Sequence, residues 1–156
     1  MAKIPTSAKL GKDVLDRFYT KPSVVDELLQ HIDVKDYDVV VEPSAGSGSW
    51  SNKIEDCLAI DISPANEDII QGDFLSDDFL FDDMKKDNKI LVIGNPPFGR
   101  QSKLAKRFFN KSAEFADTIA FILPRSFRKE SVQMVLTKKK KDIKFSSQTK
   151  EIVIGK

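Results

Sequence analysis

The run Asn95-Pro96-Pro97-Phe98 combines residue types suited to holding a planar amino group. Asn95 and the Pro96 carbonyl each offer a hydrogen-bond acceptor, and the two prolines stiffen the backbone between them. The amine of adenine is a poor nucleophile because its lone pair is delocalised into the ring. Two hydrogen bonds accepted from its N–H groups would localise that lone pair, and Phe98 would stack on the base, a contact worth roughly 1–3 kcal/mol in single-strand binders. The run therefore predicts a site that activates an exocyclic amine.

Three upstream segments favour a nucleoside-type ligand. Glu42 to Gly48 is a turn in which glycine lets a ligand approach the backbone, and no Gly-Lys-Ser/Thr follows it as in a phosphate loop. Asp61 ends the next apolar run, where an acid accepts hydrogen bonds from ribose hydroxyls. Asp73 and Phe74 follow a third run, placed to contact an adenine amino group and ring face. The structural alternatives are a plain glycine turn and a turn-forming aspartate.

Unbroken apolar runs alternate with helical or loop segments along the chain, which is typical of parallel strands buried on both faces. Strands are expected at residues 38–42, 57–61, 69–71, 89–94 and 118–123, and helices at 22–32 and 102–115, with at most a short helix at 50–56. We therefore predict an α/β fold, a Rossmann-like, doubly wound and mostly parallel sheet in one domain over residues 1–156. Ligands of such sheets bind beyond the carboxyl ends of the strands.

The two ends of the chain differ from this pattern. Residues 1–15 are polar and mixed, and we expect them to be flexible. Residues 138–156 form a lysine-rich tail with two short alternating runs, at 142–147 and 151–155. The runs either form a closing hairpin or belong to a truncated or altered C-terminus.

Bulk composition narrows the class of protein. The 156 residues are 40% hydrophobic, with 25 basic and 24 acidic side chains. No apolar run approaches the roughly 20 residues that span a bilayer, so we expect no membrane partner. The single cysteine, Cys57, excludes an internal disulfide and favours the cytoplasm, and with one histidine, His31, no zinc site is expected. Acidic residues crowd positions 77–87, whereas basic residues gather after Asn95.

The order of these motifs resembles the Asn-Pro-Pro-Phe class of amino-methyltransferases, which includes the N6-adenine enzymes of DNA and RNA. The resemblance covers roughly Asp16 to Arg128. The segment Asp16–Pro22 resembles the motif of that class that closes over the methionine end of S-adenosylmethionine, and Leu123–Arg128 resembles the segment after its fifth strand.

This resemblance implies methyl transfer from S-adenosylmethionine to the N6 amine of adenine in DNA or RNA, with no metal. It implies a catalytic set of Asn95, Pro96, Pro97 and Phe98, and a cofactor-binding set of Phe18, Tyr19, Thr20, Glu42, Ser44, Gly46, Gly48, Asp61, Ile62, Asp73 and Phe74. Nucleic acid would contact Phe98, Arg100, Arg125 and Arg128.

Three alternatives stay open. The acceptor could be a protein glutamine amide or guanine N2, or the chain could be a catalytically silent binding subunit. The chain leaves no room for a separate target-recognition domain, so a protein partner is a candidate for that role.

Overall fold

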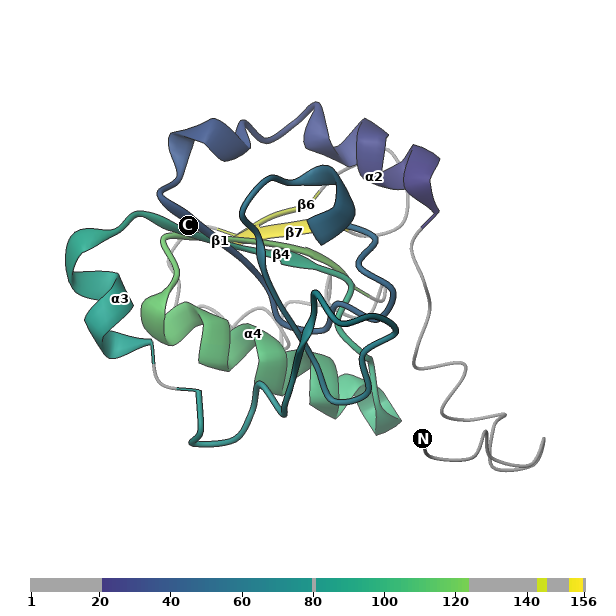
Figure 1. Ribbon diagram of the computed structural model, residues 1–156, viewed down its shortest axis with the longest axis vertical. Coiled ribbons are helices and arrows are strands. Elements are labelled where there is room, and N and C mark those ends of the chain that lie inside the picture. The colour runs from purple at the N-terminus through teal and green to yellow at the C-terminus, as the bar shows by residue number, and fades with distance from the viewer. Residues whose placement is uncertain (1–20, 80, 124–142, 146–151, 156) are drawn as a thin grey trace.

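The computed structural model describes residues 21–79, 81–123, 143–145 and 152–155. Its core is one seven-stranded sheet in the order β3-β2-β1-β4-β5-β7-β6. Figure 1 shows the sheet nearly edge-on, between the helices. The strands are β1 Val39–Glu42, β2 Leu58–Asp61, β3 Ile70–Gln71, β4 Ile90–Gly94, β5 Thr118–Ile122, β6 Ile143–Phe145 and β7 Ile152–Gly155. The first five are mutually parallel, whereas β7 runs antiparallel to both β5 and β6.

The strand order reverses between β1 and β4, which are hydrogen-bonded neighbours. From β1 the chain proceeds outward to β2 and β3, then returns to β4 and proceeds the other way to β5. The loops after β1 and β4 therefore leave the same edge of the sheet side by side. This is the position at which open parallel sheets bind ligands.

Helices lie on both faces of the sheet (Figure 1). Helix α2, Pro22–Leu29, covers one face, and α4, Lys103–Phe115, covers the other, with the short α3, Asp82–Asp87, near the end of α4. Three 3-10 turns complete the described elements, η1 Val34–Asp36, η2 Ser51–Lys53 and η3 Arg100–Ser102. Within the described chain, the connections from β1 to β2 and from β2 to β3 contain no α-helix.

Alternate residues of β1, β4 and β5 enter two separate cores, because side chains on a strand point in turn to opposite faces. Val41, Val92 and Phe121 pack with Phe108 and Phe109 of α4. The intervening strand residues pack on the other face with α2, in a cluster that includes Val25, Leu28, Val40, Leu91, Ile93, Ala120 and Ile122. Burial on both faces explains why the strands read as unbroken apolar runs.

The sequence located these elements well. All five expected strands and both long helices form, within one to three residues of their expected bounds. The segment 50–56 contains only the 3-10 turn η2. Of the two readings of the tail, the structure shows the hairpin, and β7 pairs with β5 over four residue pairs. Among the described residues, no helix is both long and apolar enough to cross a bilayer.

Candidate functional site

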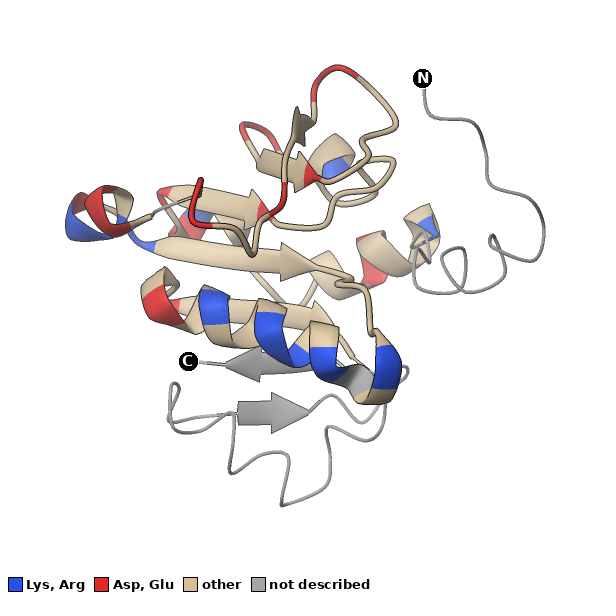
Figure 2. Ribbon diagram, turned by 90° about the horizontal axis from the view of Figure 1, so that it is seen from below, with Lys and Arg blue, Asp and Glu red and all other residues tan. Residues whose placement is uncertain are grey.

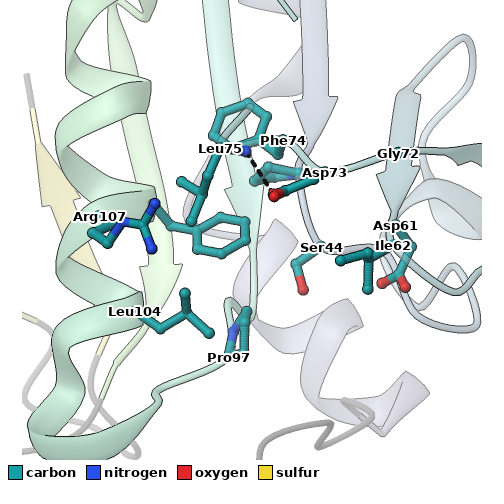
Figure 3. Close-up of a pocket in the computed structure, with 12 residues that line it drawn as sticks. Ser44, Asp61, Ile62, Gly72, Asp73, Phe74, Leu75, Pro97, Leu104 and Arg107 are labelled. Carbon is teal, nitrogen blue, oxygen red and sulfur yellow. Dashed lines mark hydrogen bonds between the residues drawn. The ribbon is translucent and has the colours of Figure 1, made fainter. Parts of the chain in front are cut away.

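A pocket of about 350 Å³ opens at the carboxyl ends of the parallel strands (Figure 3). Its volume falls in the range common for small-molecule sites, about 300–1,000 Å³. Loops after β1, β2, β3 and β4 line it together with the first half of α4. The lining residues are Pro43, Ser44, Asp61, Ile62, Gly72, Asp73, Phe74, Leu75, Pro97, Leu104, Arg107 and Phe108. Figure 3 shows Leu104 and Arg107 on one side and Ser44, Asp61 and Ile62 on the other.

Asp61 connects the pocket to the glycine turn. Its Oδ2 accepts a hydrogen bond from Gly46 N at 2.8 Å, and its Oδ1 accepts one from Ser63 N at 2.8 Å. A carboxylate has about four acceptor positions, so these two bonds leave capacity for hydroxyl donors of a ligand. Asp61 is 8% exposed and lines the pocket, while the next side chain, Ile62, is 59% exposed. The turn-forming and ligand-binding roles of Asp61 are therefore compatible.

Glu42 lies beneath the glycine turn and does not line the pocket. It is only 1% exposed, and its carboxylate accepts hydrogen bonds from Ser51 N at 2.9 Å and Trp50 N at 3.4 Å. Burial raises the pKa of Glu42 to about 7, against the lowering effect of these bonds, and the nearby Asp61 raises it further. Glu42 is one of the residues predicted to bind cofactor. In the structure its carboxylate instead binds backbone N–H groups at the end of the turn.

Two glycines shape the same turn. Gly46 and Gly48 have φ of 59° and 86°, the left-handed region that side chains disfavour. A Cβ on Gly48 would lie 2.9 Å from Ser51 Oγ, so the Ser51 side chain would have to move in addition to the backbone strain. Neither glycine lines the pocket, but Gly46 donates its backbone N–H to Asp61.

The predicted catalytic run leaves the end of β4 between two glycines with positive φ, Gly94 at 155° and Gly99 at 70°. Pro97 lines the pocket, Pro96 is buried, and Phe98 is half-buried against the core of α4. The Phe98 carbonyl accepts a hydrogen bond from Ala105 N at 3.2 Å, which fixes the loop to the first turn of α4. Asn95 is half-buried, and Arg100 is exposed.

Asp73 and Phe74 differ in how they face the pocket. Asp73 is exposed, and its Oδ1 accepts a hydrogen bond from Leu75 N at 2.9 Å. Phe74 is 1% exposed and lies among other rings, stacked on Phe108 at 5.6 Å between centroids. Phe108 therefore covers the ring face of Phe74 that was predicted to contact adenine, and little of the Phe74 ring is left for a ligand.

The structure brings together six of the predicted site residues, Ser44, Asp61, Ile62, Asp73, Phe74 and Pro97. Phe18, Tyr19, Thr20, Arg125 and Arg128 lie outside the described residues. The sequence prediction missed the α4 wall of the pocket, Leu104, Arg107 and Phe108. Leu104 and Phe108 fall within the helix expected at 102–115, and their i, i+4 spacing is the one sequence signal that both lie on one face.

The described residues contain no group of three histidine, cysteine, aspartate or glutamate side chains that could hold a metal ion. Cys57 is half-buried beside Glu42, and burial, followed by the charge of Glu42, raises the pKa of its thiol to about 12. A thiol with that pKa stays protonated near neutral pH and is a poor nucleophile.

A scan against models of known protein families matched no part of the chain, and a search of curated proteins found no match. The fold and the pocket define an α/β protein with a mostly parallel sheet and a ligand-sized cavity at its switch point. Any more specific assignment depends on the chemistry of the site.

Proposed function

We propose that this chain is an S-adenosylmethionine-dependent N-methyltransferase that methylates the N6 amine of adenine in DNA or RNA. One observation carries the proposal: a single pocket is lined by both Asp61, the predicted ribose-binding acid, and Pro97 of the predicted amine-binding run. The methyltransferases that the sequence resembles normally end their sheet with an antiparallel hairpin on a longer tail, so the antiparallel pair β6–β7 beside β5 adds support.

The pocket residues fit a nucleoside with a charged tail. Asp61 would accept hydrogen bonds from the ribose hydroxyls, and the exposed Ile62 would pack against the flat adenine ring. Asp73 would accept from the adenine amino group, and Ser44 lies in the turn over which the methionine end would extend. When bound, S-adenosylmethionine supplies an electrophilic methyl group.

The chain's own residues would activate the acceptor by position. Asn95 and the Pro96 carbonyl would accept hydrogen bonds from the two N–H groups of the amine and localise its lone pair. Gly94 and Gly99 bracket the run, and the bond from Ala105 N to the Phe98 carbonyl holds it in place. A strong general base is unnecessary, because the proton leaves after the methyl has arrived. Such positioning supplies several kcal/mol of barrier lowering.

Isothermal titration with S-adenosylmethionine tests the cofactor assignment. We expect saturable one-to-one binding, weakened at least tenfold in Asp61→Ala, because losing a hydrogen bond to a charged group costs about 1.5–3 kcal/mol. Asp68→Ala is the matched control, since Asp68 is an exposed acid in the loop that follows Asp61. Equal affinities of both variants, or no binding by the folded wild type, would contradict the assignment.

Asn95→Ala tests the catalytic assignment. We expect turnover on adenine-containing DNA or RNA to be lost while affinity for S-adenosylmethionine changes less than twofold, because of the two ligands Asn95 would contact the acceptor and not the cofactor. Mass analysis of the digested product distinguishes N6-methyladenine from methylated guanine, and a glutamine-containing peptide substrate tests the protein-amide alternative. Loss of cofactor binding in a folded Asn95→Ala would count against this division of roles.

A further inference from the structure

Charge is unevenly distributed on the side of the sheet that α4 covers. Figure 2 shows basic residues along the turns of α4, acidic residues on the loops around β3, and residues of both signs on α3. The beginning of α4 and the turn before it carry four basic side chains, which we call the α4 cationic face: Arg100, Lys103, Lys106 and Arg107. Arg100, Lys103 and Arg107 are exposed, and Lys106 is half-buried.

These four cations have no anionic partner among the described residues, in contrast to two lysines elsewhere in the described chain. Lys53 and Lys86 form ion pairs with Asp26 and Asp83. Within the described ranges, no ion pair or side-chain hydrogen bond involves a member of the α4 cationic face. Four positive charges that no described residue pairs with favour binding of an external anion.

Lys111 marks where this surface ends. It continues the helical spacing of Lys103 and Arg107, but its Nζ donates to the Ser76 carbonyl at 2.6 Å and lies 5.1 Å from the centre of the Phe74 ring. Four carboxylates also act on it, those of Asp73, Asp77, Asp78 and Glu114. A polyanion on α4 would therefore be attracted to the first two turns and repelled beyond them.

The α4 cationic face adjoins the pocket, because Arg107 lines the pocket wall and the face begins directly after Phe98 and Gly99. From Lys103 to Arg107 the helix α4 advances about 6 Å at 1.5 Å per residue, and Arg100 lies in the turn directly before it. Cations gathered over so short a stretch of chain match one sugar–phosphate strand. A single strand also delivers a base to the pocket without the energy of unpairing.

We propose that the α4 cationic face binds the phosphates of a single-stranded nucleic acid and guides its bases to the pocket. This inference rests on the proposed function, since it specifies the substrate as a single strand and locates its contacts. It assigns a substrate-binding role to Lys103, Lys106 and Arg107. Lys111 instead stabilises the fold through its hydrogen bond to the Ser76 carbonyl.

Binding of a fluorescent 12-nucleotide adenine-containing single strand, measured without cofactor from 50 to 200 mM salt, tests the surface. Affinity falls as salt rises, and each lost phosphate contact reduces the magnitude of the slope of log affinity against log salt concentration by about 0.7. We expect Lys103→Gln/Lys106→Gln to reduce the slope by about 1.4. The control Lys35→Gln/Lys86→Gln also removes two positive charges, one from η1 and one from α3, and should leave the slope unchanged.

Equal slopes for the two double variants, or tighter binding of a duplex of the same sequence, would overturn the proposal, as would no binding of DNA or RNA strands by the wild type. Titration of Lys103→Gln/Lys106→Gln with S-adenosylmethionine keeps the two proposals apart. If the cofactor binds but the slope does not change, the docking surface is wrong. If the slope changes but no form binds cofactor, the proposed methyltransferase is wrong.

Discussion

Two carboxylates at the ends of neighbouring strands have different environments and therefore different roles. Asp61 faces the pocket and accepts two backbone N–H bonds, whereas Glu42 is enclosed by Trp50, Ser51 and the backbone of the turn. Removing a charge from water is costly, so the enclosed carboxyl tends to hold its proton. The pKa of Glu42 is accordingly raised to about 7. Asp61 thus remains the acid that a ligand can reach.

Glu42 should make stability fall as pH rises. Its folded pKa of about 7 exceeds its ordinary value of 4.5, so its contribution is fully present below pH 4.5 and is lost as pH rises through 7. A shift of this size corresponds to roughly 3 kcal/mol. We expect the unfolding free energy of wild type, minus that of Glu42→Gln, to decrease by about this amount between pH 4.5 and 8. Urea unfolding at several pH values measures it, and a pH-independent difference would contradict the environment of Glu42 described above.

At the scale of elements, the loop from β4 to α4 carries the proposed chemistry and depends on its glycines. Gly99 combines φ 70° with ψ −179°, a region open almost only to glycine. A Cβ there would lie 2.6 Å from the Leu104 Cβ. The tight turn places Phe98 against the core beneath α4 and lets α4 begin four residues after Gly99.

Gly99→Ala should therefore destabilise the protein by about 1–3 kcal/mol from backbone strain, with a further cost from the contact with Leu104. Gln101 also has positive φ, at 55°, but in the milder left-handed helical region. The unfolding free energy of Gln101→Gly should stay within about 1 kcal/mol of the wild-type value, because relief of backbone strain offsets the added entropy of the unfolded chain. Thermal unfolding of both variants measures the contrast, and a neutral Gly99→Ala would show that the loop can relax.

The elements and the strand-end position of the site could be predicted because both follow from local patterns. Buried parallel strands read as apolar runs, and the motif residues follow those runs directly. The α4 wall of the pocket was missed, because Arg107 reads as a solvated cation until the helix is packed against β4. The burial of Glu42 and Phe74 was also missed, since a strand-end acid and a loop aromatic look available until the turn and the core close over them.

At the scale of the whole molecule, the two edges of the sheet differ in strand length and in how the neighbouring parallel strand is covered. On one side the sheet ends at β3, which has two residues, and both are exposed. On the other side β5 is buried throughout and is covered by β7, which itself lies between β5 and β6. The hairpin thus shields a strand that would otherwise present unpaired backbone groups along an apolar edge, a known aggregation hazard.

Val153→Pro tests the dependence of the sheet on this hairpin. Val153 pairs with Phe121 of β5 and with Phe145 of β6, so proline removes a ladder bond from a strand with neighbours on both sides. We expect a loss of stability of about 3 kcal/mol, the order of proline's cost in regular structure, with increased aggregation on heating. The matched control is Lys144→Pro in the edge strand β6, where proline is tolerated better. Differential scanning calorimetry with light scattering follows both effects. Equal, small effects of the two prolines would mean that β5 keeps its place without the hairpin, and that the pocket depends on the five parallel strands alone.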